Sequence, residues 1–592
     1  MTERPIDAEA LKARYREERD KRIRPDGARQ YITPTGRFAH YLEDLNVDPE
    51  PPRAAIHEDV EVLQIGAGFG GMQVAVQLLK AGIDDFRILD RAGDFGGVWY
   101  WNRYPGVACD IESYIYMPLL EEMGYMPSEK YAKGPEIFRY ARDLAAKFDL
   151  YRRALFRTEV SELRWDESAA RWVVTTDHGD VIRARFVNLA TGPLQRPKLP
   201  GIPGIETFKG HSFHTSRWDY AYTGGDSSGG LTGLADKRVG VIGTGATSVQ
   251  AVPHLGRHAK QLYVFQRTPA PVPVRNNKPT DPDWFKSLRP GWQKHRMENF
   301  NILLTGGKQD EDLVADGWTE QKISVGIEVD ALAGEDAERR QMADFAYMEG
   351  LRGRIDATVK DKATAEALKP WYNAGCKRPC FHDEYLQTFN LPNVALVDTK
   401  GLGVERITET GVVVDGREYE IDCLIYATGF DFNAGNMASR NGFEIYGRGG
   451  QSLTDKWLGG IATLHGFTSR GFPNLLIQAN AQGAVSSNIT HGLGEGARHF
   501  AQIVKYCRDH QVRNFDPSEP AERAWVERVS ARTYRTRHDI ECTPGYYNND
   551  GAPTAGAGIN AFYPGSSQTF FAMMQSWRDQ GGLPGMDVDQ SK

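Results

Sequence analysis

The sequence predicts an α/β protein with two Rossmann-like dinucleotide-binding domains, because one pattern of strand, glycine turn and helix occurs twice. The first copy is the apolar run VEVLQI followed by GAGFGG, residues 60–71. The second copy is VGVI followed by GTGATS, residues 239–248. In both copies a helical stretch comes next and then a second short strand, FRILD or LYVFQR. The chain has 592 residues, which leaves room for further elements around the two units.

Composition and charge exclude several classes of protein. Lys and Arg number 71 and Asp and Glu number 78, so the net charge is −7, and neither sign forms a long run. Nucleic acid and anionic membrane surfaces are therefore not expected as partners, since binding to them needs a concentrated basic field. The first residues are charged, and nowhere do 18 apolar residues follow one another, so we expect a cytoplasmic protein without a membrane segment.

Six cysteines are scattered along the chain, and we expect reduced thiols rather than a disulfide framework. Only Cys376 and Cys380 lie close in sequence, and no second pair or histidine cluster has the spacing of a zinc site. No metal site is therefore predicted. The other cysteines are Cys109, Cys423, Cys507 and Cys542.

The chain divides into four predicted regions around the two glycine turns. The N-terminal region is charged, and its helix from Ala8 to Arg22 is expected to lie on the body of the protein. Residues of about 281–370 are charged and helical in pattern, which predicts a helical insertion in the second nucleotide domain. The regions are an N-terminal extension 1–53, the first part of the first nucleotide domain 54–197, the second nucleotide domain 198–424, and the second part of the first domain with a pocket-lining loop 425–592.

The first turn contains Gly66, Gly68 and Gly71 in the order G-x-G-x-x-G, after a strand and at the start of a helix. In this fingerprint the glycines make the turn, admit a pyrophosphate and let helix and strand approach, while the phosphate charge meets the helix N-terminus. Asp90 ends the next strand, where an acidic side chain binds ribose hydroxyls. The first unit is therefore predicted to bind a dinucleotide.

The second turn has Gly243 and Gly245 but Ser248 at the third glycine position. Its second strand ends in Arg267 and Thr268 instead of an acid. A guanidinium at this point binds the 2′-phosphate of NADP, which a carboxylate would repel. An acid at one site and a base at the other predict two different dinucleotides, FAD in the first domain and NADPH in the second.

Several longer motifs resemble the type I Baeyer–Villiger monooxygenases, a family of flavoprotein monooxygenases. The stretch FKGHSFHTSRWD, residues 208–219, is similar to the family pattern F-x-G-x-x-x-H-x-x-x-W-(P/D). The stretch GGVWYWNRYPGVACD, residues 96–110, is similar to its other motif. Related flavin-containing N- and S-oxygenating enzymes share the paired nucleotide sites, but Trp218-Asp219 favours the ketone-oxidising branch. The resemblance covers residues of about 55–565, with further matches at 190–192, 427–429 and 373–390.

This resemblance implies an FAD- and NADPH-dependent enzyme that inserts one oxygen atom of O₂ next to a ketone carbonyl. NADPH reduces the flavin, O₂ adds to its C4a position, and the resulting peroxide attacks the carbonyl to form a tetrahedral adduct that rearranges to an ester or lactone. The peroxide must stay anionic, which requires a fixed cation that does not donate a proton. By the resemblance, that cation is Arg378, Asp110 orients it, and Lys377 reaches the 2′-phosphate beside Arg267.

The remaining candidate residues have supporting roles. The motif matches place Gly97 and Trp99 beside the flavin. His214 has the side chain of a catalytic acid or base, but its place in a linker between the nucleotide domains favours a structural role, which is also expected for Trp218. Tyr546 in the C-terminal loop is expected to face the substrate, although smaller-ketone members often have Trp-Tyr there. The N-terminal extension is similar to that of longer members acting on bulky or macrocyclic ketones, so bulky or large cyclic ketones are the expected substrates. An N- or S-oxygenating monooxygenase is the alternative.

Overall fold

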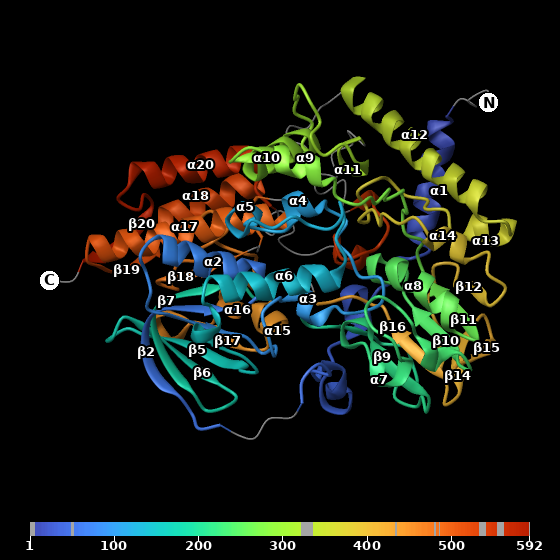
Figure 1. The fold of residues 1–592 in the computed structure, drawn as a ribbon, viewed down its shortest axis with the longest axis horizontal. Coiled ribbons are helices and arrows are strands. Elements are labelled where there is room, and N and C mark those ends of the chain that lie inside the picture. Colours follow the sequence, from blue (N-terminus) through green and yellow to red (C-terminus); the bar gives the residue numbers. More distant parts are fainter. Residues whose placement is uncertain are drawn as a thin grey trace.

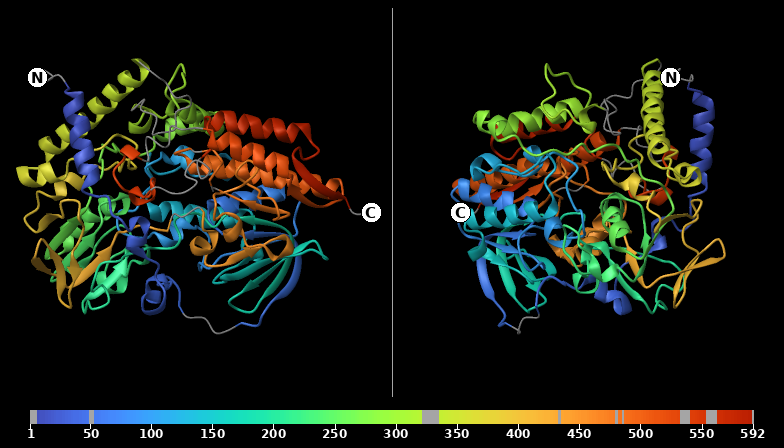
Figure 2. Two further views of the ribbon diagram at one scale, coloured as in Figure 1. Left: turned by 180° about the vertical axis from the view of Figure 1, so that it is seen from behind. Right: turned by 45° about the vertical axis from the view of Figure 1, so that its right-hand side comes forward.

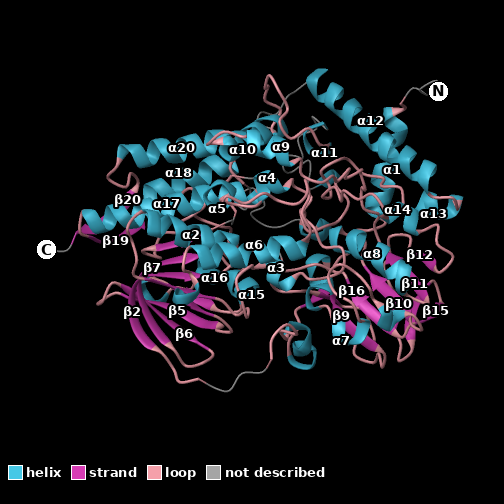
Figure 3. Ribbon diagram, in the orientation of Figure 1, coloured by secondary structure: helices cyan, strands magenta, loops and turns pink. Residues whose placement is uncertain are grey.

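The computed structural model describes residues 6–48, 53–320, 335–431, 435–478, 481–484, 486–531, 540–552 and 562–590. Its two largest sheets lie at opposite ends of the molecule, with helices above and between them (Figures 1 and 3). In Figure 1 the sheet that carries β2 and β7 is at the lower left, and the sheet that carries β10 and β16 is at the lower right. Each of the two predicted strand-turn-helix units belongs to one of these sheets.

The first sheet is parallel where it meets the first glycine turn. The order β4-β3-β2-β7 is parallel throughout, and β18 pairs in parallel with the end of β7. The second half of β2 is buried, as expected for a strand of a parallel sheet that helices cover. Strands β7, β6 and β5 then form an antiparallel meander, which β17 joins at its edge. The strands are β2 His57–Ile65, β3 Phe86–Leu89, β4 Ala154–Leu155, β5 Val160–Asp166, β6 Arg171–Thr176, β7 Val181–Leu189, β17 Glu444–Tyr446 and β18 Leu475–Ile477.

The second sheet has the order β12-β11-β10-β16-β9, and all its neighbours are parallel in the described residues. Strand β10 lies at its centre and carries the second glycine turn. The predicted boundary after residue 424 falls inside β16, which pairs along its whole length with β10. The strands are β9 His211–His214, β10 Arg238–Ile242, β11 Gln261–Gln266, β12 Val394–Asp398 and β16 Cys423–Tyr426.

Helices cover these sheets and fill the space between them. Helix α2 follows the first turn and packs along α17, and α8 follows the second turn. The predicted insertion contains five helices within its described residues, and α12 is the longest of these. The helices are α2 Phe69–Lys80, α8 Ala246–His258, α9 Pro282–Ser287, α10 Trp292–Leu304, α11 Gly317–Glu320, α12 Glu335–Thr358, α13 Lys362–Ala367, α17 Ile489–Asp509, α18 Glu519–Ser530 and α20 Ser567–Gln580.

The N-terminal extension begins with α1, Ala8–Asp20, which ends two residues before the predicted helix end. This helix lies beside α12 in every view (Figures 1 and 2), and the rings of Tyr15 and Phe345 meet edge to face at 5.7 Å. The extension continues through η1, Gly27–Gln30, to the short strand β1, Tyr31–Ile32, which pairs with β8, Leu199–Pro200. It therefore runs from the helical insertion to the start of the second nucleotide domain.

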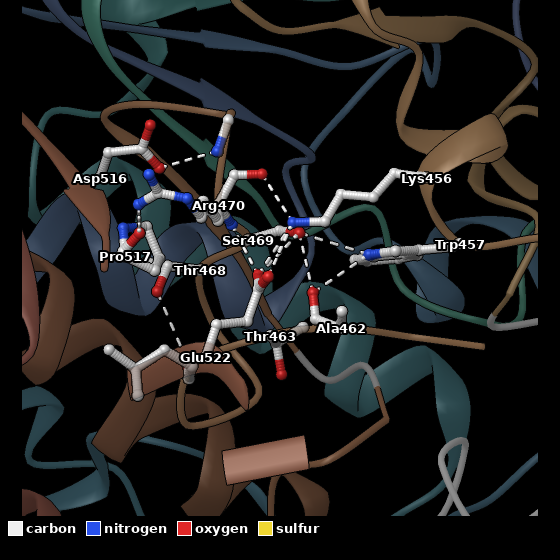
Figure 4. Close-up of polar contacts among 12 residues, drawn as sticks. Lys456, Trp457, Ala462, Thr463, Thr468, Ser469, Arg470, Asp516, Pro517 and Glu522 are labelled. Carbon is white, nitrogen blue, oxygen red and sulfur yellow. Dashed lines mark hydrogen bonds and ion pairs between the residues drawn. The ribbon is translucent and has the colours of Figure 1, made fainter. Parts of the chain in front are cut away.

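A cluster of polar side chains braces the C-terminal helices (Figure 4). Lys456 Nζ lies 2.9 and 3.0 Å from the two carboxylate oxygens of Glu522 in α18, and it donates to the Arg470 carbonyl at 2.6 Å. Glu522 also accepts the backbone N–H of Arg470 at 2.7 Å. The Arg470 guanidinium donates to the Pro517 carbonyl at 2.8 Å. Lys456 is paired with Glu522 inside the cluster, and Arg470 also pairs with Asp587 at 2.8 Å, so each charge has a partner and the cluster is a structural brace.

No helix in the described part of the chain is both long and apolar enough to cross a membrane.

Candidate active site and nucleotide sites

The first glycine turn leads from β2 directly into α2. Gly66 has a φ of +103°, and a Cβ there would lie 2.4 Å from the Ala190 carbonyl oxygen. A Cβ on Gly71 would lie only 1.8 Å from the Gly66 carbonyl oxygen, so no other residue lets helix and strand approach this closely. The turn thus places open backbone N–H groups at the N-terminus of α2, the arrangement that binds a pyrophosphate.

A cleft opens in front of this turn, with about 1230 Å³ of space including its solvent-open mouth. Gly97 belongs to the wall, and a Cβ there would meet the Gly68 Cα at 2.7 Å. The lining also includes Gly66, Gly68, Asp90, Arg91, Trp101, Tyr116, Thr191, Asn441, Gln478 and Thr490. The residues present therefore fit FAD, as the sequence predicts.

Asp90 follows β3, and backbone groups of the turn hold its carboxylate. Oδ2 accepts the Ala67 N–H at 2.6 Å, and Oδ1 accepts the Ala92 N–H at 2.8 Å. Burial raises the pKa of this carboxyl, and the two N–H groups oppose the rise. Because a carboxylate oxygen has two acceptor positions, Asp90 keeps acceptor capacity toward the cleft while it fixes the turn.

Trp99 lies behind the residues that line the cleft and is not one of them. Its side chain is buried, and its indole N–H donates to the Tyr116 hydroxyl at 3.0 Å. Tyr116 itself lines the cleft. The role of Trp99 in this structure is therefore to support a cleft residue.

The second glycine turn repeats the backbone arrangement of the first. Gly243 has a φ of +113°, and a Cβ there would lie 2.4 Å from the Ala427 carbonyl oxygen. Gly245 precedes the first residue of α8. The Oγ of Ser248 and the Oγ1 of Thr268 are buried, and neither has a hydrogen-bond partner among the described residues. Two unpartnered hydroxyls beside a glycine turn fit a second nucleotide.

Three cations gather beside this second turn, around Asp550 of the C-terminal loop. Arg267 Nη2 lies 3.5 Å from Asp550 Oδ1, and Lys198 Nζ lies 4.0 Å from Oδ2. Burial lowers the pKa of Lys377 to about 7, and the nearby charge of Arg267 adds to the shift. Lys377 Nζ donates to the Pro544 carbonyl at 3.0 Å. The fold therefore brings Arg267 and Lys377 together, as the sequence predicts for a 2′-phosphate site.

Arg378 and Asp110 form a two-pronged ion pair. Arg378 Nε lies 3.0 Å from Asp110 Oδ2, and Nη2 lies 2.5 Å from Oδ1. Trp318 of α11 donates its indole N–H to the Asp110 carbonyl at 2.8 Å, and its ring centroid lies 5.1 Å from the guanidinium carbon. Burial by itself would lower the pKa of Arg378, but the charge and hydrogen bonds of Asp110 raise it well above its ordinary value. Arg378 is therefore a permanent cation in a fixed orientation.

The C-terminal loop is joined to this segment by a disulfide between Cys376 and Cys542. The expectation of reduced thiols is wrong for these two cysteines. They are 166 residues apart, and only the fold brings them together, so their spacing in the sequence contained no signal. Cys109, Cys380, Cys423 and Cys507 are free.

Tyr546 lies four residues after Cys542 and is 44% exposed. Its ring centroid is 4.2 Å from that of Tyr547, and both tyrosines lie close enough to Arg378 to interact with its charge. The loop thus brings the predicted substrate residue next to the predicted catalytic arginine. Residues 553–561 of the predicted loop lie outside the described residues.

His214 and Trp218 are both buried in the second nucleotide domain. His214 ends β9, and its Nδ1 accepts the Ser216 N–H at 3.2 Å. Burial lowers the pKa of His214 to about 3, so the ring is neutral near pH 7 and holds the chain without exchanging protons. Trp218 donates its indole N–H to the Thr223 hydroxyl at 3.0 Å. Both placements suit the predicted structural role.

Several residues of these sites were not predicted. Trp318 lies in the helical insertion, which had no motif to mark it, and Lys198 stands in a connection between domains. Asp550 follows Tyr546 by four residues in the polar loop, and no motif there connects it to Arg267, which lies 283 residues away in the sequence. Gln30 of the N-terminal extension also accepts a hydrogen bond from Arg267.

Comparisons with known proteins agree with this geometry. Residues 63–301 match the family model of pyridine nucleotide-disulphide oxidoreductases. The chain is 51% identical to neopentalenolactone D synthase of Streptomyces avermitilis, over 98% of this chain and 99% of that protein. It is 48% identical to a Baeyer–Villiger monooxygenase of Stachybotrys chlorohalonatus, over 99% of this chain and 95% of that protein. Among solved structures, the polycyclic ketone monooxygenase of Thermothelomyces thermophila has a TM-score of 0.93 at 41% identity, covering 98% of this chain and 99% of that one.

Proposed function

Because this chain belongs to the Baeyer–Villiger monooxygenase family, we propose that its two nucleotide sites and its buried arginine divide the work of one reaction. The enzyme uses FAD and NADPH, and it inserts one oxygen atom of O₂ between a ketone carbonyl and a neighbouring carbon to give an ester or lactone. FAD, when bound, supplies the redox chemistry that activates O₂.

The first cleft holds FAD in this proposal. The turn from Gly66 to Gly71 binds the pyrophosphate through backbone N–H groups, with the N-terminus of α2 behind it. Asp90 accepts hydrogen bonds from ribose hydroxyls at the positions that Ala67 and Ala92 leave open. At the second turn, Arg267, Thr268 and Lys377 bind the 2′-phosphate of NADPH.

Arg378 is the catalytic residue, and its ion pair with Asp110 is the observation that carries this assignment. Oxygen transfer to a ketone passes through anionic oxygen species, which a nearby proton donor would quench. A guanidinium stabilises such charge without donating a proton near pH 7. Asp110 and Trp318 fix its orientation before the substrate arrives, so little reorganisation is needed during the reaction.

The substrate is a bulky or large cyclic ketone, and Tyr546 contacts it. Two features support this class: the names of relatives, which include a polycyclic ketone monooxygenase and pentalenolactone D synthases, and the exposed position of Tyr546 beside Arg378. O₂ and a small-molecule ketone are the partners. A cytoplasmic location stays a prediction from the sequence.

Replacement of Arg378 tests the catalytic assignment. Arg378→Ala should keep its flavin absorbance and still oxidise NADPH, yet form ester at less than about a hundredth of the wild-type rate, because loss of one preorganised group commonly costs 10²–10³-fold. Product formation is followed by mass spectrometry with polycyclic, macrocyclic and six-membered cyclic ketones. Ester formation at the wild-type rate would refute the role of Arg378, and a preference for the six-membered ring would refute the substrate class.

A further inference from the structure

The N-terminal extension reaches the cations beside the second glycine turn. Gln30 Oε1 accepts a hydrogen bond from Arg267 Nη1. Gln30 Nε2 donates to the Gly27 carbonyl at 2.7 Å, which orients the amide so that its oxygen faces the guanidinium. The Tyr31 hydroxyl lies 3.4 Å from Arg267 Nη2. Two adjacent residues of the extension therefore contact both terminal nitrogens of Arg267.

These two residues are themselves held in place. The carbonyl of Gln30 accepts the Gly201 N–H at 2.7 Å, next to the pairing of β1 with β8. The Tyr31 ring centroid lies 3.7 Å from Lys198 Nζ, a cation-π contact. Arg22, further back in the extension, donates its Nε–H to the Arg267 carbonyl at 3.0 Å. The extension thus contacts both the backbone and the side chain of Arg267.

The charges around Arg267 are out of balance. Lys198, Arg267 and Lys377 lie around Asp550, and the Asp431 carboxylate also acts on Lys198, so basic groups outnumber carboxylates here by three to two. The brace in Figure 4 differs, because Lys456 there is paired with Glu522, and Arg470 is paired with Asp587 outside the drawn cluster. A phosphate monoester, with a charge of about −1.5 to −2 at pH 7, would neutralise the surplus beside Arg267.

We propose that Gln30 and Tyr31 are positioning residues for NADPH selectivity and that the N-terminal extension is part of the NADPH site. A free arginine side chain loses rotamer freedom when it binds a phosphate. Gln30 and Tyr31 contact the two terminal nitrogens of the guanidinium, so that it is already ordered before the nucleotide binds. This inference rests on the proposed role of Arg267 as a ligand of the 2′-phosphate.

The test uses the FAD-loaded enzyme and two nucleotide fragments, 2′,5′-ADP, which contains the 2′-phosphate, and 5′-AMP, which lacks it. Gln30→Ala and Tyr31→Phe should each weaken the binding of 2′,5′-ADP about three- to tenfold in titration calorimetry, the effect of one ordinary hydrogen bond. The dissociation constant of 5′-AMP should not change. The KM for NADPH should rise by a similar factor, and the KM for NADH should stay constant. Lys12→Ala, on the exposed side of α1, is the control within the same extension. It should change the dissociation constant of neither fragment.

A double-mutant cycle separates this inference from the proposed function. In the Arg267→Ala background, Gln30→Ala should have no further effect on 2′,5′-ADP, because its partner is gone. The positioning role would be overturned if Gln30→Ala lowered the affinity for 2′,5′-ADP equally with and without Arg267. It would also be overturned if the variant lowered the affinity for 2′,5′-ADP and 5′-AMP equally. If Arg267→Ala itself leaves 2′,5′-ADP binding unchanged, the 2′-phosphate assignment of the proposed function is overturned. Tyr31→Phe removes only the hydroxyl group, so this variant can still test the positioning role if Gln30→Ala does not fold.

Discussion

The two nucleotide-binding turns share a backbone arrangement and differ in charge. In each, the first glycine has a positive φ and would place a Cβ 2.4 Å from the carbonyl of an Ala-Thr-Gly segment, Ala190 in one case and Ala427 in the other. The strand that follows ends in Asp90 in the first domain and in Arg267 in the second. In the proposed function, backbone geometry supplies the general affinity for a dinucleotide, and the residue after the strand selects which one binds.

The two strand ends also differ in how they are held. Asp90 is fixed by two N–H groups within its own domain, whereas Arg267 is contacted by the N-terminal extension and by the C-terminal loop. The first strand end is therefore held locally, whereas the second is contacted by distant parts of the chain. Substitutions should therefore affect the first site through folding and the second through nucleotide affinity.

The largest effect is expected at Gly71, the third position of the first turn. The matching position of the second turn, Ser248, provides the contrast. Gly71→Ala places a Cβ 1.8 Å from the Gly66 carbonyl oxygen, so the protein should lose FAD and about 1–3 kcal/mol or more of stability. Ser248→Ala at the matching position removes a buried hydroxyl of the second nucleotide site without adding an atom, so this variant should keep its FAD and its stability while the KM for NADPH rises. Flavin absorbance per mole of protein measures the FAD content of both variants, and thermal unfolding measures their stability. Full flavin content in Gly71→Ala would contradict the geometry.

The next largest difference in stability is expected between variants of Asp90 and Arg267, the residues that follow the two strands. Asp90→Ala leaves the N–H groups of Ala67 and Ala92 without their acceptor, at about 1–3 kcal/mol for each buried group. Arg267→Ala removes a side chain that is 24% exposed and should change the free energy of unfolding by less than about 1 kcal/mol. Denaturant unfolding of the two variants provides the comparison. Equal destabilisation would show that the second strand end is as self-contained as the first.

The disulfide gives the second site a covalent connection to the C-terminal loop. Replacing Cys376 and Cys542 together by Ser should lower the free energy of unfolding by about 2–4 kcal/mol. A dithiol reductant should lower the stability of the wild type by a similar amount and leave the double variant unchanged. Six titratable thiols in the unfolded, unreduced wild type would refute the crosslink.

The smallest effect concerns pH. The pKa of Lys377 is about 7 without nucleotide, and a 2′-phosphate beside it would raise that pKa. NADPH binding should therefore take up a proton above pH 7, so the KM for NADPH should rise by up to about tenfold per pH unit between pH 7 and 9. The KM for NADH should stay flat. Lys377→Arg, whose side chain keeps its proton, should flatten the NADPH profile, and a slope that survives in this variant would assign the titration to another group.

Most of the fold could be predicted from local pattern. Strand, glycine turn and helix are determined over about thirty residues, so both nucleotide units and the residues within their motifs were predicted from the sequence alone. Trp318, Asp550 and Gln30 could not be, because each acts through contacts across long sequence separations that the periodicity of a single chain does not encode. The disulfide belongs to the same class, since its two cysteines meet only after the C-terminal loop has docked on the second domain.

The disulfide also limits how far the C-terminal loop can move. Tyr546 is the fourth residue after Cys542, and a fully extended chain spans at most about 3.6 Å per residue, so Tyr546 can lie no further than about 14 Å from Cys542. Arg378, two residues from Cys376, lies at the fixed end of this tether. The crosslink therefore keeps the segment that carries Tyr546 within a fixed distance of the segment that carries Arg378.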